Sequence, residues 1–311
     1  MLNQSSPAEY VIRAMTPSDL KDVCQIDRDA FDAYRRAHRQ INRPLRLRTP
    51  ENMNAALRRP HPGVVIESPP GHIAGYCFTH VWGSLGWLGT LGVAPRKQGF
   101  GLGRAVIAAG LDVLREAGCT TLALETMPES GKNLALYTNL GLDARYMTFL
   151  YQGAITPATS THFYRWSGSG EIAAISGRIV PGLDCTPAAH WLENEEAGVT
   201  LIWREDGVPI AFAVLRHGPR RLQSTQNYLT IETAACLPGA TVHWPRYLGE
   251  MQTYAQSRGT NGLVLPVNAQ QYPLLRSMLA AGMQIVHTRV RMVSGPSIGD
   301  PDAVLMITLA M

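Results

Sequence analysis

Residues 91–103 read Leu91-Gly92-Val93-Ala94-Pro95-Arg96-Lys97-Gln98-Gly99-Phe100-Gly101-Leu102-Gly103. Glycines 99, 101 and 103 stand between an apolar run that predicts a strand and a periodic run that predicts a helix. A loop without Cβ atoms can bring several backbone N–H groups to one phosphate, and the following helix adds its free N-terminal donors. Three basic residues flank the loop and can neutralise phosphate charge: Arg96, Lys97 and Arg104. The stretch therefore predicts a phosphate-binding unit.

Two other kinds of phosphate loop fit the stretch less well. A dinucleotide fingerprint has the spacing G-x-G-x-x-G in the first strand–helix turn, followed about 20 residues later by an acidic residue. Here the spacing is G-x-G-x-G, and the loop follows a fourth strand. A Walker loop needs Gly-Lys-Ser/Thr, which is absent. A dinucleotide-dependent enzyme stays as a weaker alternative.

The hydrophobic pattern around the loop predicts ten elements in the order β-α-α-β-β-β-α-β-α-β. The predicted strands cover 10–15, 63–68, 73–81, 87–93, 121–125 and 144–151, and the helices 19–37, 51–58, 103–117 and 132–140. Segment 152–170 is rich in Gly, Ser and Thr and predicts a linker.

A similar order returns after that segment. The predicted strands are 199–203, 208–216, 228–235, 262–267 and 284–292, with helices over 247–258 and 272–281. Asn133…Tyr137 is echoed by Asn268…Tyr272. The pattern predicts two copies of one architecture, divided into domains 1–155 and 160–311.

Composition agrees with a two-domain protein. The chain has 311 residues, and no stretch approaches the ~20 uninterrupted apolar residues of a membrane helix. Its first residues are polar, and its five cysteines are scattered without a CxxC motif, so we expect a cytoplasmic protein that has no metal site and does not act at a membrane. The net charge of +4 falls entirely in residues 1–155, which carry 17 basic and 13 acidic side chains; the remainder carries 11 of each. An anionic ligand is therefore favoured in the first half.

With these residues in place, the sequence resembles the GCN5-related N-acetyltransferase (GNAT) superfamily. Residues 91–103 are similar to the family's pyrophosphate signature, with its preceding V-x-P. Asn133-Leu134-Ala135-Leu136-Tyr137-Thr138-Asn139-Leu140-Gly141-Leu142 resembles a compressed form of the second signature. The resemblance covers residues 10–150. It implies an α/β (α+β) fold of two tandem GNAT-like domains, each a mixed, mostly antiparallel sheet flanked by helices.

The resemblance also implies roles for residues. The backbone amides of the loop would hold the pyrophosphate of acetyl-CoA: Gln98, Gly99, Phe100, Gly101, Leu102, Gly103 and Arg104. Leu91, Gly92 and Val93 would pair with the pantetheine arm, and one of their amides would polarise the thioester carbonyl. Asn133 would bond the pantetheine. Tyr137 would protonate the departing thiolate, unless it is a packed core tyrosine. The expected activity is transfer of an acetyl group to a primary amine by direct attack in a ternary complex. A non-catalytic acyl-CoA sensor is the alternative.

The sequence departs from the family on the fourth strand, where many members carry a glutamate as general base. Residues 86–93 contain no carboxylate. Glu125 on the next strand and His80 on the preceding one are the candidate substitutes. Each also fits a non-catalytic role, and water is a third candidate for the base.

A second departure lies in the C-terminal copy. Where a pyrophosphate loop is expected, Cys236-Leu237-Pro238-Gly239-Ala240-Thr241-Val242-His243-Trp244-Pro245 has one glycine and two prolines. Proline has no N–H, so this segment cannot present a run of amides. We expect a degenerate second copy that does not bind CoA by the usual route, and hence one working site per chain.

Six arginines within residues 35–48 could recognise a carboxylate or phosphate on the acceptor, or form a solvated basic face. They are Arg35, Arg36, Arg39, Arg43, Arg46 and Arg48. No binding motif favours nucleic acid. The expected partner is a small-molecule or peptide amine, and the expected assembly is a monomer (a pseudo-dimer) or a homodimer.

Overall fold

The computed structural model describes residues 10–38, 48–195, 197–217, 228–296, 298–300 and 302–307. The elements of the first half are β1 (Val11–Ala14), α1 (Leu20–Ala37), α2 (Pro50–Leu57), β2 (Gly63–Glu67), β3 (Ile73–Trp82), β4 (Leu85–Val93), α3 (Leu102–Glu116), β5 (Thr121–Thr126), α4 (Gly131–Thr138) and β6 (Asp143–Gly153).

The second half repeats this order and adds one strand. Its elements are β7 (Tyr164–Arg165), α5 (Glu171–Ile179), α6 (Thr186–Asn194), β8 (Gly198–Glu205), β9 (Val208–Arg216), β10 (Tyr228–Cys236), α7 (Trp244–Ser257), β11 (Gly262–Asn268), α8 (Tyr272–Ala280), β12 (Gln284–Ser294) and β13 (Val304–Ile307). The predicted repetition is confirmed. It extends to β7, α5 and α6, which the sequence pattern did not indicate.

Helix α3 shows why the predicted elements form. Its buried residues include Val106, Ile107, Leu111 and Leu114, which recur at helical spacing and pack on the sheet. The helix ends before Gly118, whose φ of 85° is left-handed and suits glycine.

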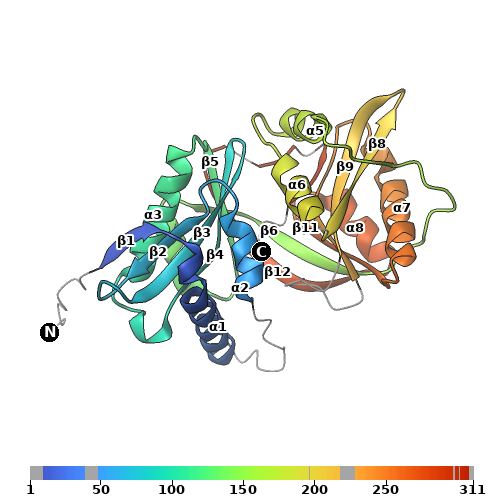
Figure 1. Ribbon diagram of the computed structural model, residues 1–311. Helices are drawn as coiled ribbons and strands as arrows, with labels where there is room; N and C mark the ends of the chain where they lie inside the picture. The colour runs from blue at the N-terminus through green and yellow to red at the C-terminus, as the bar shows by residue number, and fades with distance from the viewer. Residues whose placement is uncertain are drawn as a thin grey trace.

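The strands of both halves form one continuous sheet in the order β1-β2-β3-β4-β5-β12-β6-β11-β10-β9-β8-β7, with β13 paired to β10. The last strand of each half is exchanged. β12 pairs with β5 from Val290↔Thr126 to Ser294↔Leu122, and β6 pairs with β11 from Leu263↔Gly153 to Asn268↔Thr148. β6 and β12 also pair with each other, and Figure 1 shows them side by side between the halves. Each half thus completes the other's sheet.

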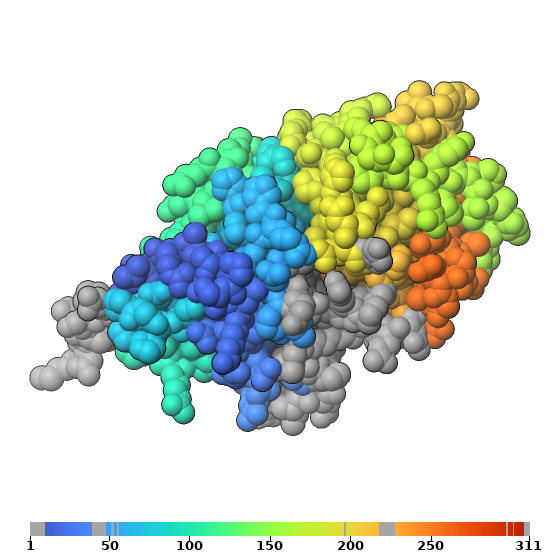
Figure 2. All heavy atoms as spheres, in the orientation of Figure 1, coloured from blue at the N-terminus to red at the C-terminus, as the bar shows by residue number. Residues whose placement is uncertain are grey.

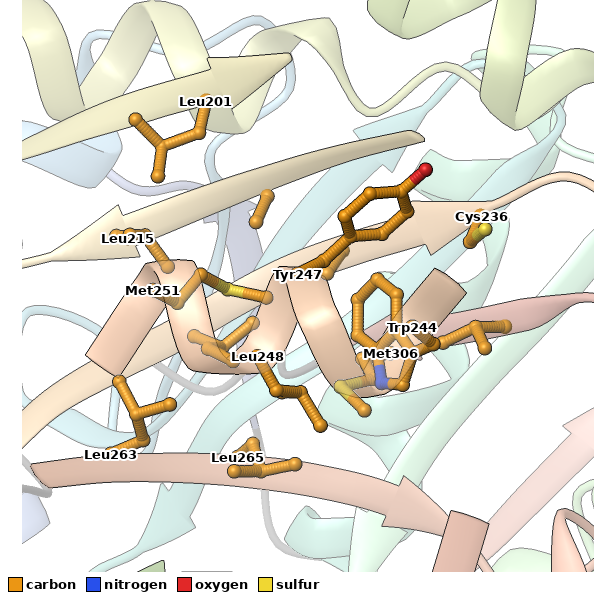
Figure 3. Packing of buried hydrophobic residues seen from close by; sticks show 14 of the residues in the cluster. Leu201, Leu215, Cys236, Trp244, Tyr247, Leu248, Met251, Leu263, Leu265 and Met306 are labelled. Atoms are coloured by element: carbon orange, nitrogen blue, oxygen red, sulfur yellow. The ribbon is translucent and has the colours of Figure 1, made fainter. Parts of the chain in front are cut away.

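Helices cover both faces of the sheet. Tyr76 and Phe78 of β3 pack with residues of α1 and α2, whereas Cys77 between them packs with α3, as strand alternation requires. Trp82 and Trp87 share a core cluster with α5 and α6, so helices of the second half also lie against strands of the first. The second half has its own core between the sheet and α7, shown in Figure 3, in which Trp244 and Met306 belong to one cluster.

The segment after β6, predicted as a linker over 152–170, is hydrogen-bonded to helix α7. β6 continues to Gly153, and helix α7 binds the chain beyond it. The Ala158 N–H donates to the Gly249 carbonyl (3.0 Å), and the His162 N–H donates to the buried Glu250 carboxylate (2.8 Å). No described helix combines the length and apolar character that a membrane span requires.

Candidate functional site

The glycine loop connects β4 to α3. Gly99 and Gly101 have φ of 90° and 81°, which side chains other than glycine rarely adopt. The first hydrogen bond into α3 runs from the Ala105 N–H to the Gly101 carbonyl (3.1 Å). Within the described part of the chain, the N–H groups from Gly99 to Arg104 have no protein acceptor. The loop therefore presents consecutive free donors at the positive end of a helix.

The basic residues near the loop remain at the surface. Arg96 and Arg104 are exposed, and Lys97 is partly exposed. The side-chain amide of Gln98 donates to the Val93 carbonyl (3.1 Å), which connects the loop to the end of β4. Phe100 is 54% exposed although it is apolar. The surroundings suit an anion that carries apolar groups.

Beside the loop, strands β4 and β5 diverge from each other. Their parallel pairing runs only from Leu85↔Thr121 to Trp87↔Ala123, after which β5 continues against β12. β4 carries a bulge at Gly89 and Thr90 opposite β3. From Leu88 to Val93, its edge toward β5 faces no paired strand among the described residues.

A hydrogen bond at the end of β4 shows which of its backbone groups face the open edge. The Ala94 N–H donates to the Ala74 carbonyl on β3 (2.9 Å). Because backbone groups alternate along a strand, those of Leu91 and Val93 turn to the open side and those of Gly92 turn to β3. Of the three residues predicted to meet an extended ligand arm, Leu91 and Val93 have the suitable orientation.

In the second half the corresponding edge is closed. β10 pairs in parallel with β11 only from Tyr228↔Gly262 to Thr230↔Val264. Beyond that point β13 pairs with β10, from Thr233↔Ile307 to Cys236↔Val304. The segment before α7 forms a short 3-10 helix, Thr241–His243. In it the His243 N–H donates to the Ala240 carbonyl (3.0 Å). Among the described residues, the edge of β10 is thus filled where that of β4 is open, and two residues without an N–H, Pro238 and Pro245, lie before α7 and in its first turn.

Tyr137 and Asn133 both lie on α4. Tyr137 is buried, and burial, with a smaller contribution from Cys77, raises the pKa of its hydroxyl. Cys77 is the cross-strand partner of Leu91, which places the tyrosine behind the open edge of β4. Asn133 is partly exposed one turn earlier. The counterpart Tyr272 lies at the start of α8 and is 67% exposed, so the two echoed tyrosines differ in burial.

Glu125 is held in a buried ion-pair network. Its Oε1 accepts from Arg291 Nη2 (2.6 Å) and its Oε2 from Arg289 Nη1 (3.1 Å), both from β12. Burial opposes the charge most strongly, yet the two arginines hold the pKa of Glu125 below its ordinary value. A carboxylate so paired is a weak proton acceptor, and this environment favours a structural role.

His80 is also fully engaged. Its Nδ1 lies 2.9 Å from Arg59 Nη1, and its Nε2 lies 2.5 Å from the Gly89 carbonyl. Since guanidinium only donates and a carbonyl only accepts, the imidazole is neutral with its proton on Nε2. Burial and the neighbouring Arg59 lower the pKa of His80 to about 3. The ring fixes the bulge of β4 and has no free nitrogen for a substrate proton.

Sequence reasoning missed a buried acid on the other side of β4. Asp27 of α1 accepts from Tyr76 of β3 and from Arg48 Nη1 (2.8 and 3.0 Å). The side chain of Arg48 also lies over the Phe31 ring. The signal was an acidic residue on the otherwise apolar face of α1 together with the arginine segment. Within that segment Arg35 and Arg36 pair with Asp32, whereas Arg39, Arg43 and Arg46 lie outside the described residues.

Comparison with known proteins assigns this part of the chain. Residues 21–142 match the acetyltransferase (GNAT) family. This segment is a GNAT domain. It contains the loop, β4, β5 and α4, and it ends immediately before the exchanged strand β6.

The curated relatives of the GNAT domain include two mycothiol acetyltransferases. The protein of Kocuria rhizophila is 34% identical over 94 residues, which cover 28% of this chain and 31% of the relative. The protein of Clavibacter sepedonicus is 30% identical over 131 residues, 42% of either chain. These matches span less than half of each relative's length.

Solved structures extend the likeness to the whole fold. A GCN5-related N-acetyltransferase from Sphaerobacter thermophilus has a TM-score of 0.60 at 16% identity, covering 96% of this chain and 99% of that one. A tandem GNAT protein from the clavulanic acid biosynthesis pathway has a TM-score of 0.58 at 14% identity, covering 93% and 100%. The chain therefore has a tandem GNAT fold with two GNAT-like halves. Among the described residues, no group of histidine, cysteine and carboxylate side chains is arranged to bind a metal.

Proposed function

We propose that the chain transfers an acetyl group from acetyl-CoA to a primary amine by direct attack within a ternary complex. One observation supports this most strongly: free amides of a glycine loop lie next to an open strand edge in the GNAT domain. A cofactor with a pyrophosphate and an amide-bearing arm needs both features at once. The family assignment supports acetyl transfer in general.

In this proposal each part of the cofactor meets its own set of donors. The pyrophosphate is held by the N–H groups of Gly99–Arg104, with Arg96 and Arg104 near its charge. The pantetheine arm pairs with Leu91 and Val93 as a strand would, and Asn133 bonds it from α4. Charge-assisted bonds to phosphate contribute about 1.5–3 kcal/mol each.

The transfer step then follows from the geometry of β4. The amine nitrogen attacks the thioester carbon, and an amide of Leu91 or Val93 stabilises the negative charge on its oxygen. The C–N bond forms, the C–S bond breaks, and the thiolate takes the Tyr137 proton. Burial raises the pKa of Tyr137 and so keeps its hydroxyl protonated until the thiolate departs, and solvent reprotonates the tyrosine after the transfer. Water takes the proton lost by the amine, since Glu125 and His80 are both engaged.

A non-catalytic acyl-CoA sensor is a second candidate. It is favoured by the same engagement of Glu125 and His80, which leaves neither of the two predicted bases available for a substrate proton. It shares the cofactor site and differs in having no turnover.

The first test is ligand-induced thermal stabilisation. Acetyl-CoA should raise the Tm, and NAD should not. At a hundredfold excess over its Kd, a ligand increases the free energy of unfolding by about 2.7 kcal/mol. Stabilisation by NAD alone would support a dinucleotide enzyme instead. Absence of any shift with acetyl-CoA or CoA contradicts the proposal.

The second test separates enzyme from sensor. A panel of amines is screened for thiol release, and Tyr137→Phe is compared with Tyr272→Phe, a matched control on the exposed counterpart. For an enzyme, Tyr137→Phe should lower kcat by about 10²-fold or more while the Kd for acetyl-CoA is kept. Tyr272→Phe should behave as wild type. Acetyl-CoA binding without turnover of any amine would instead indicate the sensor.

A further inference from the structure

A cluster of cationic and aromatic side chains lies where the two halves meet on the α1–α2 side of the sheet. Arg59 follows α2, Trp191 belongs to α6, and Arg216 ends β9. The guanidinium carbons of both arginines lie 4.6 Å from the centre of the Trp191 ring. Figure 2 shows the end of α2 in light blue directly against α6 in yellow, and the ion pair of Arg58 with Glu195 joins these helices beside the cluster.

The two arginines differ in their partners. Arg216 pairs with the buried Glu232 of β10 (2.7 Å). Arg59 donates from Nη1 to the neutral ring of His80, and it has no carboxylate partner among the described residues. Its Nε is buried without a hydrogen-bond acceptor. The free Nε edge of a guanidinium is the edge that binds an oxyanion with two parallel bonds.

The charge of Arg59 is only weakly compensated by its neighbours. Burial, and then repulsion from Arg216, lower the pKa of Arg59 to about 10, with Glu232 acting weakly in the opposite direction. A buried guanidinium is unfavourable unless an anion pairs with it. Trp191 and His80 hold Arg59 in a fixed position, so its free edge is already oriented.

The position of Arg59 relates it to the transfer site. Arg59 bonds His80, and His80 bonds the Gly89 carbonyl in the bulge of β4, just before Leu91 and Val93. Arg59 is thus linked through one imidazole ring to the strand that would hold the thioester. That separation suits a small molecule carrying both an amine and an anionic group.

We propose that Arg59, stacked on Trp191 between the two halves, binds an oxyanion of the acceptor, so that the acceptor is an amine that also bears a carboxylate or a phosphate. This inference rests on the proposed acetyl transfer and specifies its substrate class. The second half contributes to the site through Trp191 and Arg216, which gives the degenerate copy a role in acceptor recognition.

The kinetic test uses matched amines that differ only in the anion: β-alanine against β-alaninamide, and O-phosphoethanolamine against ethanolamine. The wild type should prefer the anionic member of at least one pair, and the preferred pair distinguishes carboxylate from phosphate. Arg59→Gln keeps a donor toward His80 and removes the charge. It should raise KM for the anionic acceptor by roughly 10- to 100-fold, with kcat within a few fold. Arg58→Gln, the exposed neighbour, is the control and should leave KM unchanged.

The binding test does not depend on turnover. With CoA saturating the loop and ionic strength held constant, inorganic phosphate should raise the Tm of the wild type and of Arg58→Gln, but not of Arg59→Gln. If Arg59→Gln does not fold, Arg59→Lys keeps the charge without the two-bond edge and should show a reduced shift.

The outcomes separate the two proposals. Equal use of neutral and anionic amines, or the same phosphate shift in wild type and Arg59→Gln, overturns the anion site while acetyl transfer stands. A phosphate shift that depends on Arg59, with no thiol release from any amine, keeps the site and contradicts the transferase. Absence of a phosphate shift in the wild type, together with no preference for β-alanine over β-alaninamide, also overturns the site.

Discussion

The two candidate bases show how much a residue's environment decides its chemistry. The residue types and strand positions of Glu125 and His80 suit proton transfer. The partners that engage them come from distant parts of the chain: Arg289 and Arg291 lie 164 and 166 residues from Glu125, and Arg59 lies 21 residues from His80. A local sequence pattern identifies a titratable group on a strand. It cannot show which charges will surround that group after folding.

Replacing Glu125 should therefore affect stability more than chemistry. Glu125→Gln leaves the buried Arg291 and the partly buried Arg289 without their carboxylate and should reduce the free energy of unfolding by about 3–5 kcal/mol. Because the folded pKa of Glu125 is lowered, its contribution is complete above the unfolded value of 4.5 and is lost as pH falls through the folded value. Denaturant unfolding at neutral and acidic pH measures both effects.

The activity of the same variant provides the check on its role. At a low temperature at which Glu125→Gln remains folded, the variant should keep the acidic limb of the pH profile of kcat/KM. Loss of that limb in Glu125→Gln would restore Glu125 as the general base.

His80 gives a separate pH prediction. Its pKa is about 3 in the folded chain and about 6.5 unfolded, so the unfolded state binds the additional proton first as pH falls. Stability should decline below about pH 6.5, by up to about 1.4 kcal/mol per pH unit. His80→Gln keeps one donor and one acceptor and should lack this decline. Unfolding curves at pH 7 and pH 5 isolate the effect from Glu125, whose titration lies lower. Equal slopes in both proteins would contradict the assignment of a neutral His80.

At the scale of elements, the loop between β4 and α3 was the most predictable part of the chain. The sequence predicted a helix over 103–117 and the structure has α3 over Leu102–Glu116. Glycine spacing specifies local backbone conformation, which is why the loop could be located without tertiary information. β13 and the helices α5 and α6 were not predicted. The four residues of β13 are too few to show a periodicity, and their pairing with β10 is a long-range contact that a local pattern does not encode.

The loop can be tested with a matched pair of glycines at the two ends of α3. Gly101 and Gly118 have φ of 81° and 85°, and a Cβ at either position would contact nothing. Alanine at each should reduce stability by about 1–2 kcal/mol, from the left-handed backbone alone. Only Gly101→Ala places a methyl group where the phosphate approaches, so only this variant should weaken acetyl-CoA binding, by roughly 10- to 100-fold. Calorimetric titration measures the Kd values. Equal affinities would show that the loop does not bind the cofactor.

At the scale of the whole molecule, repetition was visible in the sequence and strand exchange was not. A repeated order of elements predicts two similar halves, but it carries no information about which copy of a strand joins which sheet. β6 and β12 have similar neighbours available in both halves. Their placement is decided by contacts such as the pairing of Arg291 with Glu125, and these exist only in the assembled sheet.

The exchange predicts that the two predicted domains do not fold separately. Segments 1–155 and 160–311, produced alone, should aggregate or self-associate, because each carries a strand that belongs in the other sheet and lacks the strand that completes its own. Production of both segments together should restore a folded complex that binds acetyl-CoA. Circular dichroism and size-exclusion chromatography report the outcome. A monomeric, folded 1–155 segment would contradict the prediction and support independent domains.

The exchanged strands also bear on descent. Two finished domains joined end to end would each keep their own last strand, whereas here the connection leaves β6 inside the second half's sheet and returns along α7. This is the strand order that two identical chains would have if they exchanged their final strands and were then joined into one chain. Fusion frees the copies to diverge: one can lose its glycine loop and fill its open edge with β13 while the other keeps both. Two identical chains must carry the same loop and the same strand edge, whereas the two halves of this chain can differ in both.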